Sequence, residues 1–218
     1  MPARPNAMSV SGLLVAGYAI TVLAVDRLVV TGAIPLDSLA SSPVGLLHGR
    51  LWTMLTSGFV TAGGLPLVQT ATLAAVLVAF AARHGGWLVV RTALAAHVGS
   101  ALIAYAGVLL LTDTGIATDR PDLVSPDYGT SCVWFGCVAG LAAIELMALR
   151  RRPLAASLVL APATLLVVAT SPLSADPLTA AEHLLALTIG ATVGGAAGRR
   201  RPLQRRRLAD ELAPIPQS

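Results

Sequence analysis

Long apolar stretches that carry almost no charge constrain this chain more than any other feature of its sequence. A helix needs about 20 consecutive apolar residues to cross the hydrocarbon core of a bilayer. Six stretches approach or exceed that length, at residues 10–30, 65–82, 88–111, 131–149, 154–169 and 180–198. Only 12% of the residues are charged, far fewer than in soluble domains. The sequence therefore predicts an all-α, polytopic membrane protein in which residues 1–198 form a bundle of six transmembrane helices.

The basic residues are distributed unevenly between the two sides that six spans create. If both termini are cytoplasmic, only Arg27, Arg50 and Arg120 of the 15 basic residues lie on the outer side. Cytoplasmic loops of membrane proteins are enriched in basic residues, so we expect a plasma-membrane protein with both termini in the cytoplasm. The other arginines flank the apolar stretches or lie in the tail 199–218, which indicates contact with the lipid bilayer and argues against a nucleic-acid partner. We expect that tail to be solvated and disordered.

The connection between the first and second stretches, residues 31–64, is long for a bare loop. Trp52, Leu55 and Phe59 recur in it at helical spacing. Trp side chains favour the membrane–water boundary, and amphipathic helices lie in the plane of that boundary. We therefore expect a short interfacial helix or a partly inserted loop here, with Trp52 near the lipid headgroups.

The two cysteines, Cys132 and Cys137, both lie in the fourth stretch. Five residues apart on a helix, they point to different faces, so the sequence predicts no disulfide between them. No spacing of Cys and His residues is typical of a metal site, and we expect no cofactor.

Pairs of glycines four residues apart occur in the fourth and sixth stretches. They are Gly136 with Gly140 and Gly190 with Gly194. Small residues at this spacing allow two helix backbones to approach closely. Each pair alone is compatible with ordinary packing, but the two together predict that the fourth and sixth spans contact each other.

Polar side chains inside membrane spans are costly to bury and mark functional sites by default. Ser131 lies where an outer connection enters the fourth stretch, and its hydroxyl suits either a helix N-cap or a nucleophile. His183 lies about one turn into the sixth stretch, on the same helical face as Gly190 and Gly194. If that face meets the fourth span, the imidazole lies at the depth of Ser131 and can accept its proton. The alternative role for His183 is a hydrogen bond to a backbone carbonyl or a neighbouring hydroxyl.

Other polar residues have structural interpretations. His97 lies in the middle of the third stretch, and we expect it to bond across to another helix. Glu145 lies near the inner end of the fourth stretch and is expected to be a solvated helix end. Glu182 faces another side of the helix than His183, so it is a poor orienting group for that ring. His84 is expected in a loop.

Three segments, in order along the chain, resemble motifs of the rhomboid family of intramembrane serine proteases. "LWTMLTSGFVTAG" resembles the family's outer-loop motif W-R-x-x-T-S-x-F-x-H. "DYGTSCVWFGCVAGL" resembles its G-x-S-G stretch, with Ser131 at the nucleophile position. "EHLLALTIGATVGG" resembles its last-span His followed by G-x-x-x-G, with His183 at the base position. The resemblance covers about residues 50–198 and agrees with six spans.

The resemblance implies a Ser131–His183 dyad in a water-filled cavity that opens outward. It also implies single-span membrane proteins as substrates, cut near the membrane surface. Active rhomboids carry H-x-x-x-N on the second span, where side chains help to hold the oxyanion. Pro66 and Thr70 stand at these two positions here. The oxyanion candidates that remain are Gln69 and Thr70, together with the backbone N–H of Ser131.

Further departures from the family pattern leave the activity open. Cys132 replaces the glycine after the nucleophile, and Thr53 replaces the arginine of the outer-loop motif. A "D-x-G-x-S" stretch without H-x-x-x-N is similar to a divergent, actinobacterial-type group of rhomboid-like membrane proteins. One interpretation is a serine-type intramembrane protease, and the other is a catalytically inactive rhomboid-like protein that binds membrane helices or lipids. A third, an unrelated transport component, leaves the paired Ser and His unexplained.

Overall fold

The computed structural model describes residues 7–61, 66–114, 121–124, 126–148 and 177–211. Within these ranges all named elements are helices. The long ones are α1 (Ala7–Val30), α4 (Pro66–His84), α5 (Gly86–Asp113), α7 (Thr130–Ala148) and α9 (Pro177–Glu211). The connections contain the short α-helices α2 (Pro43–Leu47), α3 (Thr53–Thr56) and α6 (Pro121–Val124).

Five helices are long and apolar enough to cross a membrane, which makes the chain a multi-pass membrane protein. They are α1, α4, α5, α7 and the Pro177–Arg199 part of α9. Each matches one of the six predicted spans to within a few residues at either end. The fifth predicted span, residues 154–169, lies outside the described residues. Beyond its apolar part, α9 continues as a helix through Glu211, although the tail from residue 199 was expected to be disordered.

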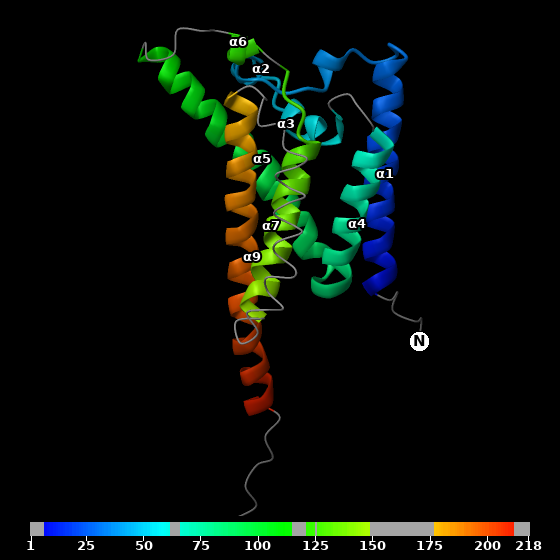
Figure 1. Cartoon of the computed structure of the whole chain (residues 1–218), viewed down its shortest axis with the longest axis vertical. Coiled ribbons are helices and arrows are strands. Elements are labelled where there is room, and N and C mark those ends of the chain that lie inside the picture. Colours follow the sequence, from blue (N-terminus) through cyan, green and yellow to red (C-terminus); the bar gives the residue numbers. More distant parts are fainter. Residues whose placement is uncertain (1–6, 62–65, 115–120, 125, 149–176, 212–218) are drawn as a thin grey trace, which may run out of the picture.

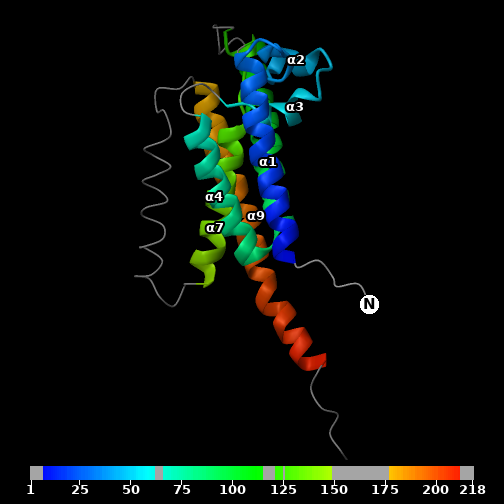
Figure 2. The ribbon, with the colours of Figure 1, turned by 90° about the vertical axis from the view of Figure 1, so that its right-hand side faces the viewer.

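The long helices run side by side in one bundle (Figures 1 and 2), and in Figure 1 α7 lies between α9 and α4. This helix packs against α9, α5 and α4, whereas α1 packs mainly against α4. The short helices α2, α3 and α6 gather at the end of the bundle where α7 and α9 begin (Figure 1). The arginine distribution predicts that this end faces outward, and we call it the outer end.

Large apolar side chains cover much of the bundle surface. Leu13 is 74% exposed, Trp87 72% and Leu184 65%. A soluble bundle would turn such residues inward, but lipid tails are as apolar as leucine, so the outward faces of membrane helices remain apolar. The interior is filled by other apolar side chains, among them Leu73, Leu77, Phe80, Val133, Phe135 and Ile144.

Among its described residues, the first outer connection contains the α-helices α2 and α3 and two short 3-10 helices, Leu36–Ser38 and Ser57–Phe59. Trp52 and Leu55 are 56% and 55% exposed, and Trp52 Nε1 donates to the Ser38 carbonyl at 3.2 Å. Thr53 and Met54, on the other side of α3, are buried. The connection therefore presents an apolar edge away from the bundle while its other side packs onto the helices.

The predicted contact between the glycine pairs of α7 and α9 is confirmed. A Cβ atom built on Gly190 would lie 2.1 Å from the carbonyl oxygen of Gly136, and one on Gly194 would lie 2.1 Å from that of Gly140. The two backbones therefore touch at both pairs. Since the numbering rises in the same sense along both helices, α7 and α9 are parallel, and about 54 positions separate neighbouring residues.

Candidate active site

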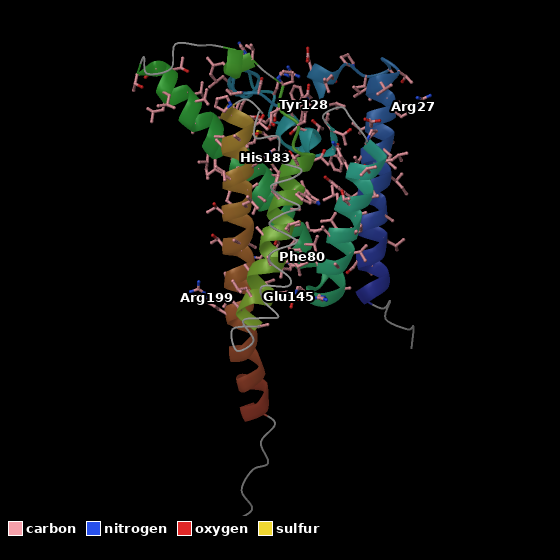
Figure 3. The ribbon with its side chains drawn as sticks, viewed as in Figure 1. Arg27, Phe80, Tyr128, Glu145, His183 and Arg199 are labelled. Atoms are coloured by element: carbon pink, nitrogen blue, oxygen red, sulfur yellow. The ribbon has the colours of Figure 1, made fainter. Side chains whose placement is uncertain are left out.

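Ser131 and His183 meet at the outer end of the α7–α9 pair. Ser131 is the second residue of α7, and His183 lies in the second turn of α9. His183 Nε2 is 2.8 Å from Ser131 Oγ, a hydrogen-bonding distance. Figure 3 shows His183 near Tyr128, at the end of the bundle opposite Glu145 and Arg199. The parallel register set by the glycines explains why the two side chains share one depth.

The imidazole of His183 is confined by an aromatic ring. The ring centroids of Phe135 and His183 are 4.4 Å apart, with an interplanar angle of 43°. Both residues are buried. Phe135 follows Ser131 by four residues, so both side chains lie on the same face of α7. The sequence did not lead us to predict a role for Phe135. An aromatic residue one helical turn after a candidate nucleophile could have indicated it.

The Ser131 hydroxyl has a second possible acceptor, the Tyr128 carbonyl at 3.4 Å. The shorter contact, to His183, is the one that can move a proton. Partial burial, together with the carboxylates of Asp37 and Asp127, raises the pKa of the Tyr128 phenol. That phenol is therefore uncharged at neutral pH and adds no negative charge beside Ser131.

The backbone that leads into Ser131 is bonded to the first outer connection. Asp127 and Ser41 exchange two backbone hydrogen bonds, Asp127 N to Ser41 O at 2.8 Å and Ser41 N to Asp127 O at 3.3 Å. Gly129 N donates to Ser57 O at 2.9 Å. The Thr130 hydroxyl donates to the carbonyl of Val60. The start of α7 is therefore held by residues that precede it by about 70 positions or more.

Buried polar side chains form a network behind this backbone. Tyr105 OH donates to Asp127 Oδ2 at 3.0 Å, and Ser41 Oγ lies 2.8 Å from Tyr105 OH and 3.4 Å from the same carboxylate oxygen. Ser41 Oγ also lies 3.2 Å from Ser57 Oγ, which in turn lies 3.3 Å from His97 Nε2. His97 was expected to bond across to another helix, and its partner Ser57 is the first residue of a short 3-10 helix, Ser57–Phe59, in the outer connection. We call Ser41, Ser57, His97, Tyr105 and Asp127 the Asp127 cluster.

The ring of His97 also explains the glycine two residues before Ser131. A Cβ atom on Gly129 would lie 1.7 Å from His97 Cε1, far inside van der Waals contact. Among the described residues, the glycines with positive φ are Gly32, Gly49 and Gly85. Gly129 is thus required by a close approach and not by its backbone conformation.

The two side-chain oxyanion candidates lie in different surroundings. Gln69 is exposed, whereas Thr70 is 4% exposed. Within the described part of the chain, Thr70 Oγ1 has no hydrogen-bond partner. A buried hydroxyl without a partner is costly and is available to a group that develops negative charge nearby.

The register of α4 and α7 gives Thr70 a depth close to that of Ser131. A Cβ atom on Gly140 would lie 3.4 Å from the Phe80 ring, and His84 Nε2 lies 3.0 Å from Glu145 Oε1. Both contacts pair a residue of α4 with one about 60 positions later on α7. When this offset of about 60 positions is extended toward the outer end of both helices, Thr70 lies at the level of the first turn of α7.

At the opposite end of the bundle, the surroundings of Glu145 and His84 differ from expectation. His84 is the last residue of α4 and not a loop residue. Its side chain is largely buried and bonds Glu145, which also pairs with Arg83 at 3.2 Å. Glu145 therefore ties α4 to α7 and is not a freely solvated helix end. Glu182 is 1% exposed, so it lies in the interior of the bundle.

Cys132 and Cys137 are free thiols, and both are buried. Cys132, at the position after Ser131, is 1% exposed. Its side chain therefore faces the interior of the bundle.

The comparisons with family models, curated proteins and solved structures gave no match to this chain.

Proposed function

We propose that the chain is a rhomboid-like intramembrane serine protease with Ser131 as nucleophile and His183 as base. The observation that carries the proposal is the 2.8 Å separation of His183 Nε2 and Ser131 Oγ. A serine hydroxyl is a weak nucleophile until an adjacent base removes its proton. The buried Phe135 ring beside the imidazole restricts its rotation, which favours the orientation that this proton transfer requires.

The dyad supports acyl transfer in two stages. In the first, Ser131 Oγ attacks the scissile carbonyl carbon while His183 Nε2 takes the hydroxyl proton, and the imidazolium then protonates the leaving amine. In the second, a water molecule attacks the acyl-serine ester and gives its proton to His183, which returns it to Ser131 Oγ. The products are two peptide fragments, and the enzyme is regenerated.

The oxyanion in this scheme is held by the backbone N–H of Ser131 and by the Thr70 hydroxyl. Thr70 is preferred to Gln69 because it is buried, has no other partner among the described residues, and lies at the depth of Ser131. An oxyanion donor is worth about 2.7–4 kcal/mol of transition-state stabilisation. With Pro66 at the other family position, we expect slow turnover.

The substrates we propose are single-span membrane proteins cut near the outer surface of the plasma membrane. Ser131 lies near the outer end of a bundle whose long helices are apolar enough to span the bilayer. A membrane-spanning helix that diffuses in the plane of the bilayer already has residues at the depth of Ser131. An extended soluble chain must first enter the bundle to reach that serine. With both termini in the cytoplasm, cleavage releases the outer part of the substrate.

Labelling with a fluorophosphonate probe tests the dyad, because the probe phosphonylates a serine only when its hydroxyl is activated. We expect the wild-type chain in detergent or nanodiscs to be labelled, and both Ser131→Ala and His183→Ala to abolish labelling. Ser38→Ala removes a hydroxyl of the outer connection that bonds only to the nearby Pro35 carbonyl; it is the matched control and should label normally. Labelling that survives Ser131→Ala would remove Ser131 as the nucleophile.

A specific observation favours a second candidate function, a rhomboid-like protein that binds membrane helices or lipids without cleaving them. Pro66 supplies no donor, and the Thr70 hydroxyl is a single short one. If the wild-type chain neither reacts with the probe nor cleaves a panel of single-span substrates, binding without cleavage becomes the better explanation. Co-purification of an intact helix with both the wild-type and Ser131→Ala chains would support it.

A further inference from the structure

A buried carboxylate lies four residues before Ser131 and takes no part in the dyad. Asp127 is 8% exposed. A carboxylate in such a place destabilises the fold unless donors satisfy it. Tyr105 OH at 3.0 Å and Ser41 Oγ at 3.4 Å are its side-chain neighbours. These hydroxyls come from α5 and the first outer connection, so one carboxylate joins three separate parts of the chain.

The backbone on either side of the carboxylate is held just as closely. Asp127 is bridged to Ser41, Gly129 N donates to Ser57 O, and the Thr130 hydroxyl donates to Val60 O. The His97 ring fills the space where a side chain on Gly129 would lie. The path from Asp127 into the first turn of α7 is therefore set by the Asp127 cluster and the outer connection.

We propose that Asp127 is a positioning residue for Ser131, and that Tyr105 and Ser41 act through it. The inference rests on the proposed function. The carboxylate, held by the two hydroxyls, sets the direction in which the chain enters α7, and this direction aims Ser131 Oγ at His183 Nε2. A displacement of about 1 Å at a reacting group can lower a rate by about a hundredfold. If the network only stabilised the fold and did not orient Ser131, disrupting it would lower the unfolding temperature and leave the reactivity of Ser131 unchanged.

Tyr105→Phe is the sharpest probe of this inference. It deletes one hydroxyl from a side chain that is 1% exposed and keeps the ring that fills the space. The Asp127 carboxylate then loses its shorter hydroxyl donor, and the charge remains buried. Asp127→Asn is the companion variant, since it keeps the size of the side chain and removes the charge. If Asp127→Asn does not fold, Tyr105→Phe alone decides the outcome.

The experiment measures the maximal phosphonylation rate and the half-saturating probe concentration for each full-length variant, together with its thermal unfolding in detergent. We expect Tyr105→Phe and Asp127→Asn to lower the maximal rate about tenfold or more and to change the half-saturating concentration less than about twofold. Glu145→Gln, which removes the negative charge that faces Arg83 and His84 at the far end of the bundle, is the control. It should lower the unfolding temperature and leave the maximal rate unchanged. Equal rate losses in all three variants, or none in the first two, would overturn the inference.

A second measurement separates this inference from the proposed function. In Ser131→Cys the introduced thiol lies beside His183, and its alkylation by iodoacetamide reports the geometry whether or not the natural chain is a hydrolase. The unsubstituted chain gives the background, because Cys132 and Cys137 are buried. Adding Tyr105→Phe to Ser131→Cys should slow alkylation about tenfold. A wild-type chain that resists the fluorophosphonate would contradict the dyad, whereas equal alkylation with and without Tyr105→Phe would contradict the positioning role.

Discussion

Gly190 of α9 rests directly on the backbone of Gly136 in α7. A methyl group on Gly190 would come within 2.1 Å of the Gly136 carbonyl oxygen, which belongs to a rigid helix backbone. No side-chain rotation relieves that overlap, so α7 and α9 must separate to admit it. This contact, repeated between Gly194 and Gly140, sets the distance and register at which the candidate dyad forms.

Gly190→Ala should therefore destabilise the bundle and uncouple Ser131 from His183. Overpacking of a tight interface costs about 1–3 kcal/mol, so thermal unfolding in detergent should occur at a lower temperature. Fluorophosphonate labelling should fall as well. Gly107→Ala on α5 is the control, because an added Cβ meets nothing within 4 Å there and alanine favours a helix. Equal destabilisation by the two variants would show that the Gly190 contact is not critical.

The His97 ring lies where a side chain on Gly129 would be. A second substitution, at His97, should therefore restore part of what a substitution at Gly129 removes. Gly129→Ala alone should reduce labelling strongly, since the methyl group would collide with the His97 ring and displace the backbone before Ser131. Adding His97→Ala opens the space. The double variant should label better than Gly129→Ala alone, as measured by the phosphonylation rate per folded molecule. If His97→Ala worsens the defect, the ring is not what requires glycine at position 129.

Phe135→Leu should lower the phosphonylation rate about two- to tenfold. Contacts between aromatic rings contribute about 0.5–1.5 kcal/mol beyond simple burial, and leucine leaves the His183 imidazole freer to turn away from Ser131. Leu184→Ala is the control. It changes a residue next to His183 that is 65% exposed on the surface of α9, and its labelling rate should match that of the wild type.

Thr70→Val distinguishes an oxyanion donor from a packing residue. Valine keeps the shape of threonine and removes the hydroxyl. If Thr70 stabilises the oxyanion, substrate cleavage should slow by about a hundredfold or more, and Thr70→Ser should restore part of the rate. Thr72→Val is the matched control, because the Thr72 hydroxyl is exposed and bonds only to carbonyls of its own helix. A gain in stability for Thr70→Val with no loss of rate would assign the hydroxyl to packing alone.

The spans and the proximity of the dyad could be predicted from the sequence because both depend on regular patterns. Hydrophobicity along the chain located the five described spans. Helical periodicity placed His183 on the face of Gly190 and Gly194, and the close approach of small residues indicated which neighbour that face would meet. These patterns lie within single helices and need no knowledge of the connections.

The Asp127 cluster could not be predicted in the same way. Ser41 and Asp127 are 86 residues apart in the chain, and serine and tyrosine hydroxyls have no spacing that distinguishes a network from isolated surface groups. Their contact depends on how the first outer connection folds back over the start of α7. Glu145 was assigned to solvent for a related reason, because its neighbour His84 depends on the register between α4 and α7.

The separation of Ser131 and His183 by 52 residues has a consequence for biosynthesis. The ribosome delivers α7 to the membrane first, and α9 is the last of the described spans to follow. Until α9 inserts and its glycines seat against α7, the serine has no imidazole beside it. If the proposed dyad is catalytic, a nascent chain that lacks α9 has no base for Ser131, and hydrolysis begins only when the last of these spans has entered the bilayer.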